Sequence, residues 1–219
     1  MRVAVHGATG KVGREVVSLV EQAGDLAYAG AFGSRANPGE LPECDVVIDF
    51  SAPQAAMELL GRLEGTALPL VVGTTGFTAE QASRLRDEGR TRPILISANF
   101  TLGFEAFRMA ATDLASRLPQ AAIAVIETYN AQKKPAASGT TQGLVANLSA
   151  IPPERDITTE IHRIGNTPGI NTVCFDLGVA SVDLTLTVES RAAYAAGALA
   201  AARWLAGRAN GTYTSTDML

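Results

Sequence analysis

The sequence predicts an α/β protein, with a parallel sheet in the first part of the chain and a smaller α+β domain with a mixed sheet after it. In the first part, short apolar runs typical of buried strands alternate with stretches of helical periodicity. This alternation favours parallel strands joined by helical crossovers. Beyond residue 155, strand-like segments follow one another without helices between them, which is typical of a mixed or antiparallel sheet.

The elements of the first part can be assigned in order. Strands are expected at the apolar runs 2–6, 26–32, 45–50, 68–72 and 93–98. Helices are expected where apolar residues recur every three or four positions, at 11–22, 52–63 and 79–88. Pro53 suits the first turn of the second helix, with Ser51 as its expected N-cap.

The second part combines its elements differently. Helices are expected at 104–118 and 138–148, and strands at 122–128, 157–164, 172–177 and 182–188. An alanine-rich helix is expected at 192–205, and residues 212–219 give little signal. The three successive strands predict the second sheet.

Composition argues against several classes of function. The 219 residues include 18 Lys and Arg and 22 Asp and Glu without a block of basic residues, which disfavours nucleic acid and membrane surfaces as partners. Two widely separated cysteines show no metal-like spacing, so no metal site is expected. No apolar run approaches the ~20 residues of a membrane span, and the start does not resemble a signal peptide. We therefore expect a cytoplasmic protein.

A glycine-rich turn carries the strongest local signal. Gly7, Gly10 and Gly13 follow a predicted strand and open a predicted helix, which is the context of a dinucleotide fingerprint. Small residues there let the backbone approach a pyrophosphate, whose charge is stabilised by helix N-terminal amides. The turn predicts a Rossmann-type parallel sheet with a cofactor site at Gly7, Thr9, Gly10, Lys11, Val12 and Gly13. A simple tight turn is the alternative.

The end of the second predicted strand indicates which cofactor binds. NAD-preferring sites usually have Asp or Glu there, whereas this chain has Gly33, Ser34 and Arg35. Ser34 and Arg35 suit a 2′-phosphate, so NADPH is expected, with NADH as the alternative cofactor and a solvated loop charge as the alternative role of Arg35. Two further loops at strand ends suit the nicotinamide ribose and carboxamide, through Gly73, Thr75, Ala98, Asn99 and Phe100.

Four motifs occur in the order found in the dihydrodipicolinate reductase family: IDFS at 48–51, VGTTGF at 72–77, SANFTLG at 97–103 and ASGT at 137–140. The chain resembles this family over nearly its whole length. The resemblance implies a dinucleotide-binding domain at 1–101 and 191–219, and a substrate-binding and oligomerisation domain at 102–190. It also implies a homotetramer built through the substrate-domain sheets.

The family signature, Glu-x-His-His-x-x-Lys-x-Asp-Ala-Pro-Ser-Gly-Thr, is only partly kept. The matching residues are Glu127, Lys133, Ser138, Gly139 and Thr140. Tyr129 and Asn130 replace the two histidines. Neither His6, in the first strand, nor His162, on a later strand, is an obvious replacement.

The kept residues form a candidate substrate site. The turn Ser138-Gly139-Thr140 is expected to cap the next helix and face a substrate carboxylate with its amides and hydroxyls, while Lys133 adds a positive charge. In the family the first histidine and the lysine have acid and substrate-binding roles, so the resemblance makes Tyr129 and Lys133 the catalytic candidates. The Tyr129 phenol can donate a proton or a hydrogen bond. A packed aromatic with its hydroxyl at the surface is the alternative.

The resemblance implies an NAD(P)H-dependent reductase of the lysine and diaminopimelate pathway, acting on a small dicarboxylate, a cyclic imine of the tetrahydrodipicolinate type. One alternative is a reductase of another small imino or keto acid. The other is a catalytically inactive NADPH-binding homologue that lost the histidines. The retained Lys133, Ser138, Gly139 and Thr140 favour an enzyme, because a pure cofactor sensor would not need them.

Overall fold

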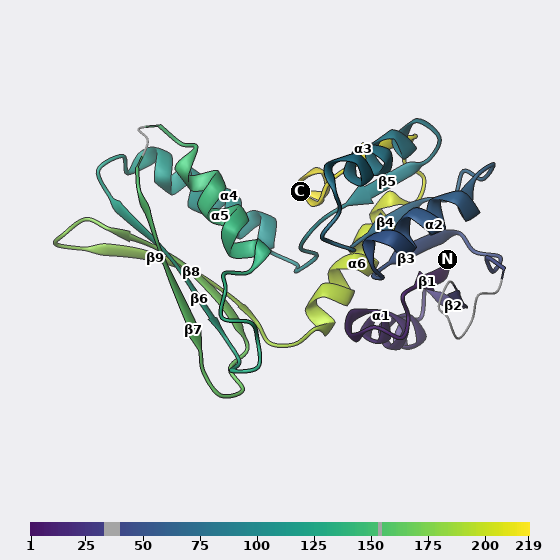
Figure 1. Cartoon of the computed structure of the whole chain (residues 1–219), viewed down its shortest axis with the longest axis horizontal. Coiled ribbons are helices and arrows are strands. Elements are labelled where there is room, and N and C mark those ends of the chain that lie inside the picture. The colour runs from purple at the N-terminus through teal and green to yellow at the C-terminus, as the bar shows by residue number, and fades with distance from the viewer. Residues whose placement is uncertain (33–39, 153–154) are drawn as a thin grey trace. The chain divides into compact units, whose positions relative to one another are not determined.

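The computed structural model describes residues 1–32, 40–152 and 155–219, and the chain divides into two compact units. The first unit comprises Met1–Leu102 and Arg191–Leu219, and the second comprises Gly103–Ser190. Each unit has its own sheet, and the colours of Figure 1 show that the chain leaves the first unit once and returns to it with its last segment.

Among the described residues of the first unit, six strands form its sheet: β1 (Arg2–His6), β2 (Ala27–Phe32), β3 (Val46–Asp49), β4 (Leu70–Val72), β5 (Pro93–Ile96) and β10 (Gly211–Tyr213). All are parallel, in the order β10-β5-β4-β3-β1-β2. The strands β2 and β3 lie on opposite sides of β1, so the winding of the chain reverses there. Ligands of such sheets bind outside the carboxyl ends of the strands at this reversal. The predicted parallel sheet is confirmed.

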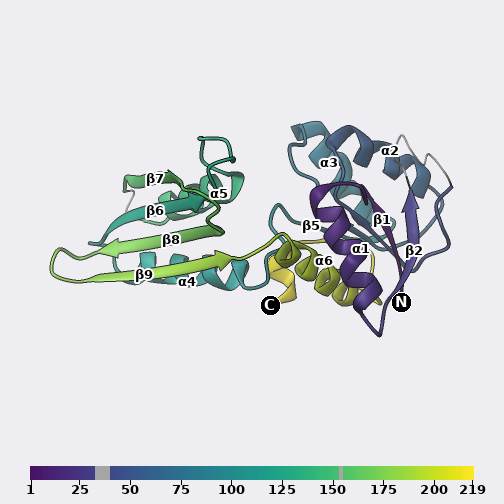
Figure 2. The same ribbon diagram turned by 90° about the horizontal axis from the view of Figure 1, so that it is seen from below.

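Helices cover both faces of this sheet: α1 (Lys11–Gln22), α2 (Pro53–Leu63), α3 (Ala79–Asp87) and α6 (Ala192–Leu205). Side chains alternate along a strand, so Val3 and Val5 of β1 pack with α1 and α6, whereas Ala4 packs with α2 and α3. Figure 2 shows these two pairs of helices on opposite faces. Burial on both faces explains why the central strands β1, β3, β4 and β5 are predominantly apolar.

Two local features of this unit differ from the sequence predictions. The N-cap of α2 is Ala52, not Ser51, and no side chain caps this helix. The reason is that Pro53 occupies the first helical position, which leaves Ser51 one residue too early to cap. The last segment, which gave little signal, forms β10 beside β5 and a short 3-10 helix at Ser215–Met218.

In the described part of the second unit, four strands form the sheet: β6 (Ala122–Tyr129), β7 (Ile157–Arg163), β8 (Gly169–Asp176) and β9 (Ser181–Val188). Their order is β7-β6-β8-β9, with β7 parallel to β6 and the other pairs antiparallel, so the predicted mixed sheet is confirmed. The helices α4 (Phe104–Arg117) and α5 (Gly139–Ser149) pack on one face over Val125 and Val173. Figure 1 shows both helices on the same side of this sheet.

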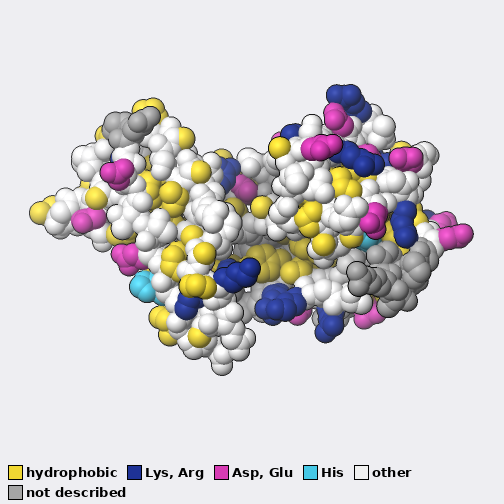
Figure 3. Space-filling model, viewed as in Figure 1, with side chains coloured by type: hydrophobic (Ala, Val, Ile, Leu, Met, Phe, Trp, Pro, Cys, Tyr) yellow, Lys and Arg dark blue, Asp and Glu magenta, His cyan; other side chains and the backbone are white. Residues whose placement is uncertain are grey.

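The surface carries charges of both signs. Figure 3 shows Lys and Arg interspersed with Asp and Glu on the drawn face, without a field of one sign. Among the described helices, none combines the length and the apolar character that a membrane crossing requires. Within the same described part of the chain, no three His, Cys, Asp or Glu residues gather in a way that could hold a metal ion.

Candidate cofactor and substrate sites

The glycine-rich turn lies between the carboxyl end of β1 and the start of α1 (Figure 1). Gly7 has a φ of 81°, a left-handed conformation that favours glycine, and a Cβ there would lie 2.7 Å from the carbonyl carbon of Phe50. A Cβ on Gly13 would lie 2.8 Å from the carbonyl carbon of Gly7. The Gly10 amide donates to the Gly7 carbonyl at 2.9 Å. These glycines therefore keep α1 close to the end of β1.

The N-terminus of α1 is built to attract an anion. Gly10 is its N-cap, no side chain caps the helix, and its first turn contains no acidic residue. The amides of Lys11, Val12 and Gly13 have no acceptor within the helix, because the first amides of any helix lack one. The helix dipole and the exposed Lys11 make this end positive. Together with the exposed Thr9, the turn suits the pyrophosphate of a dinucleotide.

A buried network connects three strand ends beneath this turn. His6 ends β1 with its side chain buried, and its Nδ1 lies 2.7 Å from Oδ1 of Asp49, which ends β3. The other carboxylate oxygen of Asp49 accepts from the Thr74 hydroxyl at 2.7 Å. That hydroxyl in turn accepts from the Ser51 amide at 2.8 Å. The loops after β1, β3 and β4 are thereby held together.

The two threonines of the loop after β4 differ in solvent exposure. Thr74 is buried in the network, whereas Thr75, the predicted cofactor residue, is exposed. Gly73 packs against Phe50, since a Cβ on it would lie 2.7 Å from ring atom Cδ1. The sequence analysis missed Thr74, because two adjacent threonines give no indication of which one is buried.

The loop after β5 contains the other predicted cofactor residues. Ala98 is exposed and Asn99 is half-buried, as suits residues that meet a ligand. Phe100 is 5 % exposed and belongs to the core of the unit, so its side chain serves packing. Ser34 and Arg35, predicted to hold a 2′-phosphate, lie outside the described residues.

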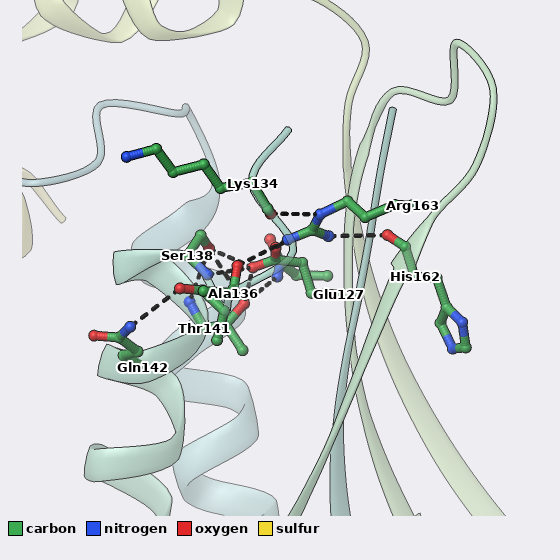
Figure 4. Close-up of polar contacts among 10 residues, drawn as sticks. Glu127, Lys134, Ala136, Ser138, Thr141, Gln142, His162 and Arg163 are labelled. Carbon is green, nitrogen blue, oxygen red and sulfur yellow. Dashed lines mark hydrogen bonds and ion pairs between the residues drawn. The ribbon is translucent and has the colours of Figure 1, made fainter. Parts of the chain in front are cut away.

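Glu127 of β6 organises the candidate substrate site in the second unit (Figure 4). Its side chain is fully buried and accepts hydrogen bonds from the Ser138 amide, the Ser138 and Thr141 hydroxyls and the Arg163 guanidinium. The Arg163 bond, to Oε1, measures 2.7 Å. Burial alone would raise the pKa of Glu127, but these bonds outweigh it and hold the pKa below its ordinary value. Glu127 is therefore a carboxylate that fixes the start of α5 to the sheet.

Arg163 of β7 connects this carboxylate with the loop before α5. Its guanidinium also donates to the carbonyls of Lys134 and Ala136, both at 2.9 Å. Figure 4 shows the guanidinium between Glu127 and these carbonyls, with the Lys134 side chain extending away from Glu127. The sequence analysis missed Arg163, because it lies 36 positions from Glu127 in the chain.

The turn before α5 caps the helix as predicted. The Ser138 hydroxyl accepts from the Thr141 amide at 3.3 Å. However, the amide and hydroxyl of Ser138, which were expected to face a substrate, donate to Glu127 in the structure. The backbone amides of Gly139, which is exposed, and of Thr140 lie in the first turn of α5, at the positive end of the helix dipole. These two backbone amides are the part of the turn that suits a substrate carboxylate.

The structure brings Tyr129 and Lys133 together. The Lys133 Nζ lies 3.2 Å from the centre of the Tyr129 ring, and both side chains are half-buried. Burial lowers the pKa of the Lys133 ammonium, attraction to Glu127 opposes this change, and repulsion from Arg163 adds to it. His162 is exposed, and Figure 4 shows its ring pointing away from Glu127, so it does not replace a signature histidine.

Two family models together match nearly the whole chain. The family model "Dihydrodipicolinate reductase, N-terminus" matches residues 1–100, and "Dihydrodipicolinate reductase, C-terminus" matches residues 102–219. A 4-hydroxy-tetrahydrodipicolinate reductase of Pseudomonas fluorescens is 32% identical, over 100% of this chain and 98% of the relative. One of Rickettsia bellii with the same name is 33% identical, over 99% of this chain and 94% of the relative.

A solved structure has the same fold. It is described as a dipicolinate-bound dihydrodipicolinate reductase from Paenisporosarcina sp. TG-14, and it matches with a TM-score of 0.80 over 98% of this chain and 97% of that one. Its sequence identity of 18% supports the fold alone. The two family models together span both units and carry the assignment: the chain belongs to the dihydrodipicolinate reductase family.

Proposed function

We propose that this chain is an NAD(P)H-dependent reductase of the lysine and diaminopimelate pathway, which reduces a cyclic imine dicarboxylate of the tetrahydrodipicolinate type. The observation that carries the proposal is the half-buried Lys133 beside the ion pair of the buried Glu127 with the partly buried Arg163. The charges of Glu127 and Arg163 cancel, so the positive charge of Lys133 remains as the net charge of the site, and this charge suits a dicarboxylate. The names of the relatives point to the same substrate class.

The cofactor residues of the proposal belong to the first unit. NADPH, when bound, supplies the hydride. The Gly7–Gly13 turn and the uncapped N-terminus of α1 hold its pyrophosphate, which the missing side-chain cap leaves room to bind. The exposed or half-buried residues of the two further loops hold its nicotinamide end: Gly73, Thr75, Ala98 and Asn99.

The substrate residues of the proposal belong to the second unit. Lys133 and the amides of Gly139 and Thr140 hold the substrate carboxylates, and Ser138 keeps this turn in place through Glu127. The proton that completes the reduction comes from the pair Tyr129 and Lys133. A lowered pKa makes the Lys133 ammonium a better acid, and the Tyr129 hydroxyl is the second donor of the pair.

The hydroxyl of Tyr129 can be tested alone. Tyr129→Phe removes it, and general acid assistance is commonly worth ~10²–10⁴-fold in rate. We expect kcat to fall at least about tenfold with NADPH affinity unchanged, and Tyr129→His to retain activity. An unchanged kcat in Tyr129→Phe would assign the proton to Lys133 or to water.

The cofactor preference, assembly and cellular location are further parts of this proposal. NADPH is preferred through Ser34 and Arg35. The protein is a homotetramer built through the face of the four-stranded sheet opposite α4 and α5, where Ile126 and Ile170 are half-buried and no described helix covers them. Light scattering coupled to size exclusion gives the oligomeric state, and cell fractionation tests the cytoplasmic location.

An NADPH-oxidation assay tests the activity. The substrate is generated by the synthase that precedes this step, with other small imino and keto acids in parallel. The proposal requires turnover of the cyclic imine with the highest kcat/KM of the panel. Preference for another acid would favour the alternative reductase, and NADPH binding without any turnover would favour the inactive homologue.

A further inference from the structure

The two positions where this chain lacks the signature histidines are adjacent, at the end of β6 and at the start of the loop that contains Lys133. Tyr129 is the last residue of β6, and Asn130 opens the loop. The Tyr129 ring lies under the Lys133 ammonium, 3.2 Å from ring centre to Nζ. The replacements therefore surround the lysine that the signature keeps.

The Tyr129 ring is held in place by a glycine on the neighbouring strand. A Cβ on Gly169, which is buried at the start of β8, would lie 2.6 Å from Cε1 and Cζ of the ring and 2.7 Å from its hydroxyl oxygen. Any larger residue at 169 would displace the ring. The missing side chain thus allows the ring to pack against the backbone of β8.

Asn130 folds the chain so that Lys133 returns to the ring. The Lys133 amide donates to the Asn130 carbonyl at 3.1 Å, which closes a tight turn. The Asn130 side chain accepts from the Gln132 amide at 3.2 Å, an arrangement by which asparagine stabilises turns. The Ala131 amide donates to the Gly165 carbonyl at 2.9 Å and ties the turn to the loop after β7.

The face of an aromatic ring attracts a cation. Burial and repulsion from Arg163 disfavour the charged form of Lys133. The attraction of the Tyr129 ring opposes these effects, and attraction to Glu127 opposes them too. An ammonium has three N–H donors, so the ring occupies one side and leaves donors for an anion on the other. The ring therefore holds Lys133 without using up its capacity to bind a carboxylate.

We infer that Tyr129 is a positioning residue whose ring face, fixed by Gly169 and the Asn130 turn, holds the Lys133 ammonium ready for a substrate carboxylate. This inference rests on the proposed function and deepens it. It assigns the ring a role in substrate binding, separate from the role of the hydroxyl in proton delivery. Tyr129→Phe keeps the ring face. Tyr129→Leu removes the ring face but still places an apolar side chain at this position.

Lysine-selective NMR tests the contact without any turnover. The chain has only three lysines, Lys11, Lys133 and Lys134, so assignment needs only Lys134→Arg and Lys11→Arg variants. The ring current shifts the ε-methylene signals of Lys133 upfield of those of the other two lysines. We expect this shift to persist in Tyr129→Phe and to vanish in Tyr129→Leu. Lys133 signals that coincide with those of Lys134 in the wild type would overturn the inference.

Calorimetric titration with pyridine-2,6-dicarboxylate tests the consequence for binding. We expect Tyr129→Leu to bind about two- to fivefold more weakly than Tyr129→Phe, the range of an exposed cation–π contact. Gly169→Ala displaces the ring and weakens binding in the same direction. Gly143→Ala is its matched control, because a Cβ on Gly143 meets nothing within 4 Å.

The outcomes separate this inference from the proposed function. Equal affinities of the Tyr129→Phe and Tyr129→Leu proteins would overturn the inference alone. Absence of turnover in a wild type that shows the ring contact and binds the dicarboxylate would contradict the proposed function and support the inference. In the kinetics, Tyr129→Phe lowers kcat because it loses the hydroxyl, and Tyr129→Leu, which loses both ring and hydroxyl, has in addition a higher KM than Tyr129→Phe.

Discussion

Glu127→Gln removes the charge at the centre of the candidate substrate site while keeping the size of the side chain. The wild-type carboxylate is fully buried and accepts from Ser138, Thr141 and Arg163, so both of its oxygens act as acceptors. An amide offers one oxygen and one NH2 group. If the oxygen faces Ser138 and Thr141, the NH2 group meets the Arg163 donor, and the arginine charge loses its partner.

The size of the effect follows from this geometry. Removing one partner of a buried ion pair typically costs about 3–5 kcal/mol. Arg163 is 13 % exposed and keeps its bonds to backbone carbonyls, which offsets part of the loss. We therefore expect Glu127→Gln to lower the local free energy of unfolding by about 2–3 kcal/mol, the range of a charged hydrogen bond.

Hydrogen exchange followed by mass spectrometry is the suitable assay, because a chain of two units need not unfold in one step. Peptides covering β6 and the start of α5 should exchange faster in the variant, and peptides of the first unit should not change. Asp113→Asn is the matched control, since it breaks an exposed pair with Arg117 in the same unit. Exchange as slow in Glu127→Gln as in this control would refute the reasoning.

The same residue predicts a dependence on pH. The pKa of Glu127 lies below its ordinary value of 4.5 in the folded protein. A group with a lowered pKa stabilises the folded state above its unfolded pKa and loses this contribution as pH falls through the folded value. The stability difference between wild type and Glu127→Gln should therefore be constant near neutral pH and shrink on acidification below about 4.5.

Three further predictions concern the two sites. Lys133→Ala should lower kcat/KM about 10- to 100-fold, as expected for loss of a charge-assisted contact, and leave NADPH binding intact; an unchanged kcat/KM would remove Lys133 from the site. Gly13→Ala should weaken NADPH binding about tenfold or more in a fluorescence titration, because its Cβ would lie 2.8 Å from the carbonyl carbon of Gly7. Gly24→Ala is the control and should not change NADPH binding, because a Cβ on Gly24 meets nothing within 4 Å. Arg35→Ala should narrow the difference between the affinities for NADPH and NADH. Equal affinities for the two cofactors in the wild type would contradict the proposed preference for NADPH.

Local sequence patterns predicted most of the fold. The apolar runs and helical periodicities are short-range signals, and the helix Ala192–Leu205 has the predicted bounds. The edge strand β10 was not predicted, because it is only three residues long and depends on pairing with β5. Ser51 was a plausible cap by residue type, but the position of Pro53 decides where the helix begins.

The candidate site was predictable only in part, for a similar reason. Gly7, Gly10 and Gly13 lie within one turn, so their spacing alone predicted the tight connection between β1 and α1. Arg163 joins Glu127 only through the pairing of β7 with β6, which sequence spacing does not reveal. Likewise, the contact between Lys133 and the Tyr129 ring depends on the turn at Asn130 and on Gly169, which belongs to another strand.

Transfer of deuterium from NADPH labelled at the nicotinamide C4 tests the central claim most directly. The wild-type protein is incubated with labelled NADPH and the cyclic imine formed by the preceding synthase, and the product is analysed by mass spectrometry. The proposed function predicts a reduced dicarboxylate that carries deuterium, and strongly diminished labelling with the Lys133→Ala protein. Wild-type protein that binds NADPH but leaves the dicarboxylate unlabelled would contradict it.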